Sequence, residues 1–159
     1  MLEYKIIEIG EQDLDSIQKL ADEQNLENDS TFVQRTVDEW KNGINTFSKP
    51  GEKFWGIVVD NEIVGIGGIN QDPFTDDTTL GRVRHVYIAK KYRRQGLARV
   101  LLNKIILHAR SHFKYLRLAT KNPVAALLYE SLGFVKDDSK TPRDVREKYP
   151  DRHTYYLYW

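Results

Sequence analysis

Hydrophobic and polar positions alternate along this chain with two different periods, which predict strands and helices. Short runs rich in β-branched and aromatic residues predict strands. These runs cover residues 4–9, 54–59, 63–69, 80–89, 115–120, 134–136 and 154–159. Apolar residues spaced by three and four predict amphipathic helices, each of which covers a sheet or a partner helix. These helices cover residues 14–24, 32–43, 96–112 and 123–132.

Polar residues and glycines set the ends of these elements. Asp13 is a candidate cap for the first helix, and Thr31 with Gln34 predicts a capping box for the second. The apolar stripe of the second helix consists of Val33, Val37, Trp40 and Ile44. Residues 60–62 predict a hairpin turn. The glycines of the following strand, Gly65, Gly67 and Gly68, predict a bulge or a close approach by a ligand. Loops are expected at residues 25–30, 71–79 and 140–152.

The order of elements in the second half of the chain restricts the topology. A strand at 80–89, a helix at 96–112 and a strand at 115–120 form a right-handed βαβ unit, so the two strands run parallel. Pro123 suits the first position of the next helix, and Gly133 suits its C-terminal end. No internal repeat or composition shift divides the chain, so residues 1–159 are expected to form one mixed α/β (α+β) domain.

Composition narrows the functional classes. The chain has 159 residues, a net charge of +1 and no cysteine. A near-neutral charge argues against nucleic-acid and membrane partners, and the lack of cysteine excludes thiolate chemistry. The four histidines have no metal-site spacing, so no metal is expected. The first residues lack a signal-peptide pattern, and no apolar run could span a bilayer, which predicts a cytoplasmic protein.

One stretch, residues 86–98, combines a strand end, a cationic turn and a helix start. The cations are Lys90, Lys91, Arg93 and Arg94. The first N–H groups of a helix have no internal partner and carry partial positive charge, so they bind anions. Gly96 lets the backbone approach a ligand, and Ala98 leaves room for it. These features predict a seat for a pyrophosphate.

Two blocks resemble the GCN5-related N-acetyltransferase (GNAT) family. The first is the run Arg93-Arg94-Gln95-Gly96-Leu97-Ala98, which matches the family signature Arg/Gln-x-x-Gly-x-Gly/Ala after the fourth strand. The second block consists of Asn122, Tyr129 and Leu132-Gly133-Phe134. The order of elements also agrees, so the resemblance covers nearly the whole chain. It implies a mixed, mostly antiparallel sheet with a splayed parallel pair at strands four and five and helices on both faces.

The resemblance also implies an acyl-coenzyme A co-substrate, usually acetyl-CoA, and an amine acceptor. Carried over, the backbone at Val86 and Ile88, with Tyr87 between them, would hold the pantetheine arm and the thioester. The turn Arg93–Ala98 would hold the pyrophosphate, with Arg93, Arg94, Gln95, Gly96, Leu97 and Ala98 as its members. Asn122 would contact the pantetheine, and Tyr129 would protonate the leaving thiolate as the catalytic residue. The acceptor would be a small-molecule or peptide amine that attacks directly, and a homodimer is a candidate assembly.

Other readings of the same residues remain open. Tyr129 could be core packing, Asn122 a helix cap, and the whole chain a non-catalytic acyl-CoA-binding sensor or scaffold. A phenol at the sulfur favours the enzyme, because a binding module would not need it. Nucleic-acid binding by the cationic turn is disfavoured by the 23 acidic residues.

The sequence is less informative about the general base that would deprotonate the amine and about the identity of the amine acceptor. Many relatives place a Glu four residues before the position of Val86, where this chain has Arg82, followed on the same face by Arg84. Neither guanidinium accepts a proton near neutral pH, and strand alternation predicts that His85 faces the other side. Two acidic groups could attract a small cationic amine, or could be solvated loop charges. They are Asp72, Asp76 and Asp77 in one loop, and Glu23, Glu27 and Asp29 near the other.

Overall fold

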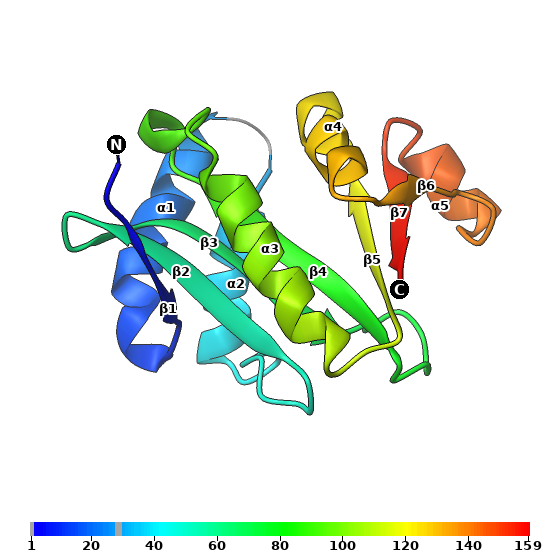
Figure 1. Cartoon of the computed structure of the whole chain (residues 1–159), viewed down its shortest axis with the longest axis horizontal. Coiled ribbons are helices and arrows are strands. Elements are labelled where there is room, and N and C mark those ends of the chain that lie inside the picture. The colour runs from blue at the N-terminus through cyan, green and yellow to red at the C-terminus, as the bar shows by residue number, and fades with distance from the viewer. Residues whose placement is uncertain (1, 28–29) are drawn as a thin grey trace.

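The chain folds around one seven-stranded sheet in the order β1-β2-β3-β4-β5-β7-β6 (Figure 1). The computed structural model describes residues 2–27 and 30–159. The strands are β1 (Lys5–Glu8), β2 (Lys53–Val59), β3 (Glu62–Gln71), β4 (Leu80–Ile88), β5 (Tyr115–Thr120), β6 (Val135–Lys136) and β7 (His153–Tyr158). Neighbouring strands pair antiparallel, except for the parallel pair β4–β5. The expected mixed sheet is therefore confirmed.

Helices cover both faces of this sheet. They are α1 (Leu14–Glu27), α2 (Phe32–Lys41), α3 (Leu97–Arg110), α4 (Pro123–Ser131) and α5 (Arg143–Lys148), with short 3-10 turns η1 (Glu11–Asp13) and η2 (Lys90–Tyr92). In Figure 1, α3 crosses the near face over β2, β3 and β4, while α1 and α2 lie behind it. The inner side of α3 buries Leu97, Leu101, Leu102, Ile105 and Ala109. Every helix in the described chain is too short or too polar to cross a membrane.

The parallel pair separates after a short contact. β4 and β5 pair only at Leu80 with Tyr115, Gly81 with Leu116, and Arg82 with Arg117. Beyond these positions β5 continues against β7, from Leu118 with Tyr155 to Thr120 with His153. The second half of β4 therefore has no strand partner on its β5 side, which confirms the splayed pair.

A bulge in β4 changes which side chains share a face. Ile66 pairs with Tyr87, and Gly68 pairs with Arg84, so Gly67 alone opposes His85 and Val86. The φ angle of His85 is 59°, a left-handed conformation that a bulge accommodates. The glycine-rich run of β3 thus marks a bulge as expected, but the extra residue is in β4. A Cβ on Gly67 would lie 2.9 Å from the Leu101 side chain, so this glycine also lets α3 approach.

Several local expectations were wrong. The α1 helix runs on to Glu27 into the expected loop 25–30, and residues 28–29 lie outside the described chain. The Thr31 side chain makes no capping bond, and the Gln34 side chain pairs with Gln18 of α1 instead of reaching back to Thr31. Asp13 belongs to η1, and its carboxylate accepts a hydrogen bond from the Gly10 N–H.

Two further differences concern exposure and a missed helix. Ile44, expected on the apolar stripe of the second helix, follows the end of α2 and is exposed. The charged segment 140–152, expected to be a loop, contains the short helix α5. Its side chains are mostly exposed, so an apolar period could not reveal it.

The α3 helix offers a test of the packing against the sheet. Leu101 is fully buried between α3 and β3, whereas Leu107 on the same helix is 69% exposed. Leu101→Ala should lower the free energy of unfolding by about 2–5 kcal/mol because it leaves a cavity. Leu107→Ala should change it by less than about 0.5 kcal/mol. Urea denaturation of the two variants measures the difference, and equal effects would contradict this packing.

Candidate active site

An open cleft of about 2220 Å³ follows the separation of β4 from β5. It is lined from one side by the turn before α3 and the start of α4, and from the other by α2 and the loop after β3. Of the predicted site residues it brings together Val86, Tyr87, Ile88, Arg93, Arg94, Gly96, Ala98, Asn122 and Tyr129. The other two lie elsewhere, because Leu97 is buried in the core and Gln95 is exposed outside the lining.

The turn before α3 presents its backbone N–H groups outward. Arg94 and Gly96 both have left-handed backbones, with φ angles of 64° and 81°. The N–H groups of residues 94–98 have no acceptor within the described chain. A Cβ on Gly96 would meet no atom within 4 Å, so the space above the turn is open. Adjacent free N–H groups at the start of a 14-residue helix form a cradle that fits a pyrophosphate.

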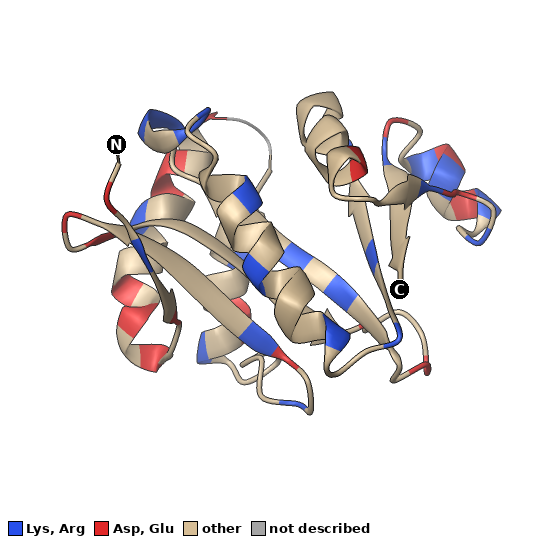
Figure 2. Ribbon diagram, in the orientation of Figure 1, with Lys and Arg blue, Asp and Glu red and all other residues tan. Residues whose placement is uncertain are grey.

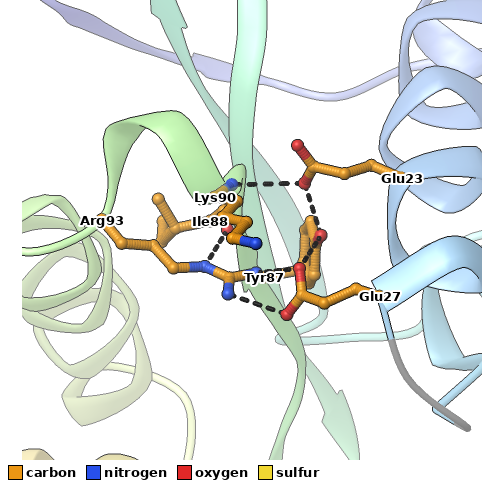
Figure 3. A network of polar contacts seen from close by, with 6 residues as sticks. All are labelled: Glu23, Glu27, Tyr87, Ile88, Lys90 and Arg93. Atoms are coloured by element: carbon orange, nitrogen blue, oxygen red, sulfur yellow. Dashed lines mark hydrogen bonds and ion pairs between the residues drawn. The ribbon is translucent and has the colours of Figure 1, made fainter.

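The Arg93 side chain does not face this cradle. Its Nε donates to the Ile88 carbonyl at 2.8 Å, and its two terminal nitrogens donate to both carboxylate oxygens of Glu27 at 2.8 and 3.0 Å (Figure 3). Each of the three guanidinium nitrogens thus donates one hydrogen bond, to Ile88 or to Glu27. Arg93 thereby joins α1 to the turn, and its binding of the pyrophosphate stays a prediction.

Tyr87 belongs to the same network. Its hydroxyl donates to Glu23 at 2.5 Å and lies 3.3 Å from Glu27, while the Arg93 guanidinium lies 5.2 Å from the centre of its ring (Figure 3). Burial and the hydrogen bond to Glu23 raise the pKa of Tyr87 well above its ordinary value. The Lys90 N–H also donates to Glu23, at 3.2 Å. The side chain of Tyr87 therefore faces α1, and only its backbone is available to a cofactor.

Two residues of α4 complete the cofactor side of the cleft. The Tyr129 ring packs edge-on against Phe134, and its hydroxyl has no hydrogen-bond partner within the described chain. Burial raises the pKa of Tyr129 to about 12, so the phenol keeps its proton near neutral pH. The Asn122 side chain accepts hydrogen bonds from the N–H groups of Val124 and Ala125, which makes it the cap of α4.

His85 does not face the side of β4 that alternation predicts. Its Nδ1 contacts the Thr36 hydroxyl of α2, and its ring lies edge-on to Phe32. Charges on α2, at Glu39 and Arg35, also act on Arg84, and the bulge brings His85 to that same side of β4. Strand periodicity could not show this, because it fails at a bulge.

The hydrogen bonds of Thr36 fix the tautomer of His85. The Thr36 hydroxyl donates to the Phe32 carbonyl, so it must accept from Nδ1–H of His85. The Nε2 atom then carries a lone pair, and it is buried without a partner in the described chain. Burial, with the nearby charges of Arg84, Arg35 and Arg82, lowers the pKa of His85 well below 6.5. The ring is neutral near pH 7.

Most of the acidic residues expected to attract a cation are already engaged; Asp76, which lines the cleft without a hydrogen bond or ion pair in the described chain, is the exception. Asp72 is buried and accepts from both Nε and Nη2 of Arg117, at 2.9 and 2.7 Å. Asp77 accepts from Thr79 and from the Tyr115 hydroxyl. Glu23 and Glu27 bind the Tyr87–Arg93 network, and Asp29 lies outside the described residues. Nor do three His, Asp or Glu side chains gather closely enough in the described chain to hold a metal ion.

Comparison with known proteins identifies the architecture. The model of the Acetyltransferase (GNAT) family matches residues 14–134, which include the cradle, Asn122 and Tyr129. The chain belongs to this family. The crystal structure of a GNAT-family acetyltransferase from Streptococcus pneumoniae superposes with a TM-score of 0.76 at 20% identity, covering 99% of this chain and 100% of that one.

Other known proteins match this chain over part of their own length. An uncharacterized N-acetyltransferase of Escherichia coli, YjgM, is 34% identical over 92 residues, which are 55% of this chain and 54% of that protein. The N-acetylglutamate synthase of Neisseria gonorrhoeae, solved with coenzyme A and N-acetyl-glutamate, has a TM-score of 0.69 at 15% identity, covering 99% of this chain and 35% of that one. The matches span between a third and just over half of the length of the curated relatives.

Substitution of Arg93 and of Arg94, the two neighbouring arginines in the turn before α3, should affect stability differently. Arg93→Gln should lower the free energy of unfolding at pH 7 by about 0.5–1 kcal/mol, because it breaks a half-exposed bidentate pair with Glu27. Arg94→Gln should leave it unchanged, because Arg94 has no ion pair within the described chain.

The pH dependence of Arg93→Gln provides a second measurement. The Arg93 hydrogen bonds hold the pKa of Glu27 below its ordinary 4.5. The pair therefore stabilises the native state above about pH 4.5, and this contribution is lost as the pH falls through the lowered pKa. The difference in the free energy of unfolding between wild type and Arg93→Gln, measured by urea denaturation, should become smaller below pH 4.5. A difference that is constant from pH 7 to pH 3 would count against this pairing.

Proposed function

We propose that this chain transfers the acetyl group of acetyl-CoA to the primary amine of a small molecule or peptide, by direct attack while both are bound. The observation that carries the proposal is the joint lining of one cleft by Arg94, Gly96 and Ala98 of the N–H cradle and by Tyr129, whose hydroxyl is protonated. An acetyltransferase needs a seat for the pyrophosphate and a proton donor for the leaving group within one cleft.

The backbone of the turn is the main cofactor ligand in this proposal. The N–H groups of Arg94, Gln95, Gly96, Leu97 and Ala98 would hold the pyrophosphate, so Gln95 and Leu97 act through the main chain although their side chains lie elsewhere. The Arg94 guanidinium is exposed beside them and adds positive charge. The coenzyme A complex of the N. gonorrhoeae enzyme, which shares the fold, supports this choice of co-substrate.

Three residues would then position the pantetheine arm. Val86 and Ile88 lie on the part of β4 that β5 leaves unpaired, so their main chain can bond to an extended ligand as a strand would. The Asn122 Oδ1 atom is used by the α4 cap, which leaves the amide Nδ2 as its available donor. In this arrangement Asn122 both caps the helix and faces the cofactor.

Tyr129 would supply the proton for the departing sulfur. Acetyl-CoA contributes a thioester whose acyl carbon an amine can attack and whose thiolate then leaves. A phenol whose pKa is about 12 stays protonated near neutral pH and can hydrogen-bond the departing thiolate. The proton that the amine loses as it becomes an amide balances the proton that the sulfur gains, so the phenol ends the reaction protonated. Its hydroxyl is free of partners in the described chain, which favours an enzyme over a non-catalytic acyl-CoA sensor. A binding module would gain nothing from an unsatisfied phenol in its cleft.

Gly96→Glu tests the cradle. The substitution should abolish acetyl-CoA binding, because it puts a carboxylate beside the N–H groups, while the fold is retained in the open space there. Gly43→Glu is a control matched in backbone and space: Gly43 also has a left-handed backbone, with φ of 77°, and a Cβ there would also meet nothing within 4 Å. Gly43 lines the same cleft, but it follows α2 and is not part of the turn before α3. Isothermal calorimetry and circular dichroism report binding and folding. Equal acetyl-CoA affinities in the two variants would refute this placement.

Tyr129→Phe tests the proton donor. The variant keeps the ring against Phe134 and removes only the hydroxyl. We expect kcat to fall roughly 100-fold where chemistry limits the rate, with acetyl-CoA affinity unchanged. Thiol release measures kcat, and calorimetry measures affinity. A near-normal kcat would remove Tyr129 from the reaction, while acetyl-CoA binding without turnover of any amine by the wild type would favour the sensor.

A further inference from the structure

Three arginines, Arg35, Arg82 and Arg84, line the cleft where α2 packs against β4. Arg82 and Arg84 lie two residues apart before the bulge and therefore share a face, and Arg35 comes from α2. The charges of all three lower the pKa of His85, which places that ring within electrostatic range of each. The basic residues of β4 and β5, which are Arg82, Arg84 and Arg117, are seen as blue bands on the two strands in Figure 2.

The protein neutralises these charges only in part. Arg82 is 8% exposed, and its sole carboxylate neighbour within 4 Å in the described chain is Asp72, at 3.8 Å. The same Asp72 oxygen is bound at 2.7 Å by Arg117, and the other accepts the Phe74 N–H. One carboxylate thus serves two guanidinium groups. Burial lowers the pKa of Arg82 to about 10, which still leaves it charged near neutral pH.

The charge of Arg84 has fewer counter-charges close to it than the charge of Arg82. It is half-buried and has neither a hydrogen bond nor an ion pair within the described chain. Burial lowers its pKa, opposed mainly by Glu39. Glu39 comes no closer than 4 Å to any cation in the described chain, and Glu52, a more distant carboxylate, is bound by Asn70 and the Gln71 N–H. A charge taken out of water without a partner is costly, so a ligand that supplied one would bind favourably.

These arginines line the same cleft as the cradle and Tyr129. They approach it from the α2 side, opposite the turn that would hold the pyrophosphate. Arg82 occupies the last paired position of β4 with β5, so the basic cluster begins where the strands separate. An acceptor that enters from the α2 side would meet guanidinium groups before it reached the thioester.

We propose that the acceptor is an amine that also carries a carboxylate, such as an amino acid, and that Arg84 with Arg35 binds that carboxylate while Arg82 adds positive charge below it. The proposal rests on the acetyl transfer proposed above and specifies its acceptor. A carboxylate accepts two parallel hydrogen bonds from a guanidinium and pairs with its charge. The same arginines repel polyamines and other acceptors that have only positive charge, which replaces the expectation of a cationic acceptor.

Matched acceptors test the chemistry of recognition. Each of a set of α-amino acids is compared with its amide, which keeps the amine and side chain but lacks the negative charge. At least one free acid should be acetylated with a kcat/KM about tenfold or more above that of its amide, measured by thiol release. Amides or 1,4-diaminobutane that react as well as every acid would overturn the proposal.

Substitutions of Arg84 and Arg35 test whether these residues cause the preference for the free acid. Arg84→Gln should raise KM for the preferred acid about tenfold or more and leave both KM for acetyl-CoA and KM for the amide unchanged. Arg35→Gln should shift KM in the same direction, and because Arg35 is exposed on α2 its loss does not threaten folding. Arg143→Gln on α5, which is exposed and outside the cleft, is the control. An unchanged KM for the acid in both test variants would contradict the assignment.

A binding measurement separates this proposal from acetyl transfer itself. Calorimetry on the protein saturated with coenzyme A compares N-acetyl amino acids with their amides. If acetyl-CoA binds but no amine is turned over, acetyl transfer fails, and a preference for the carboxylate in this titration still supports the arginine site. If amines are turned over and the acid and amide bind equally, acetyl transfer stands and the carboxylate acceptor is wrong.

Discussion

A backbone N–H or C=O group in a sheet needs a partner, and β4 loses its partner on the β5 side beyond Arg82. β5 turns instead to β7, with which it pairs along its whole length. The unpaired part of β4 is held in place by α3 on one face of the sheet and by α2 on the other, so it stays apart from β5. The cleft, the cradle at its end and the basic side chains along it all follow from this separation.

The second organising feature is an unequal distribution of counter-charges. Near the cradle every carboxylate of α1 that could compete for cations is bound: Glu23 by Tyr87 and Lys90, and Glu27 by Arg93. Around Arg82 and Arg84 a single buried carboxylate, Asp72, serves Arg82 and Arg117, and Arg84 forms no ion pair within the described chain. A chain whose net charge is only +1 thereby keeps a locally positive cleft.

The sequence predicted those features that depend on neighbouring residues. The strand, turn and helix around Gly96 follow from local chemistry, and the cap at Asn122 and the parallel βαβ pair were also predicted correctly. The separation of that pair was implied by the family resemblance. Long-range contacts were not predictable in this way. Arg93 is 66 residues from Glu27, so no local pattern could show that its guanidinium is used. The bulge at His85 reversed an alternation that holds elsewhere in β4, and this reversal hid the position of His85 beside Arg84.

The network of Glu23, Glu27, Tyr87 and Arg93 has a consequence for exchanging parts between relatives. It joins the last turn of α1 to the strand and turn that lead into α3. A chimaera that imported the first two helices from another protein, to alter acceptor choice through the α2 position of Arg35, would also import a new end of α1. Unless that end carried acids matching Glu23 and Glu27, Tyr87 and Arg93 would lose their acceptors. The proposed acceptor site and the proposed cofactor site therefore cannot be exchanged independently in this chain.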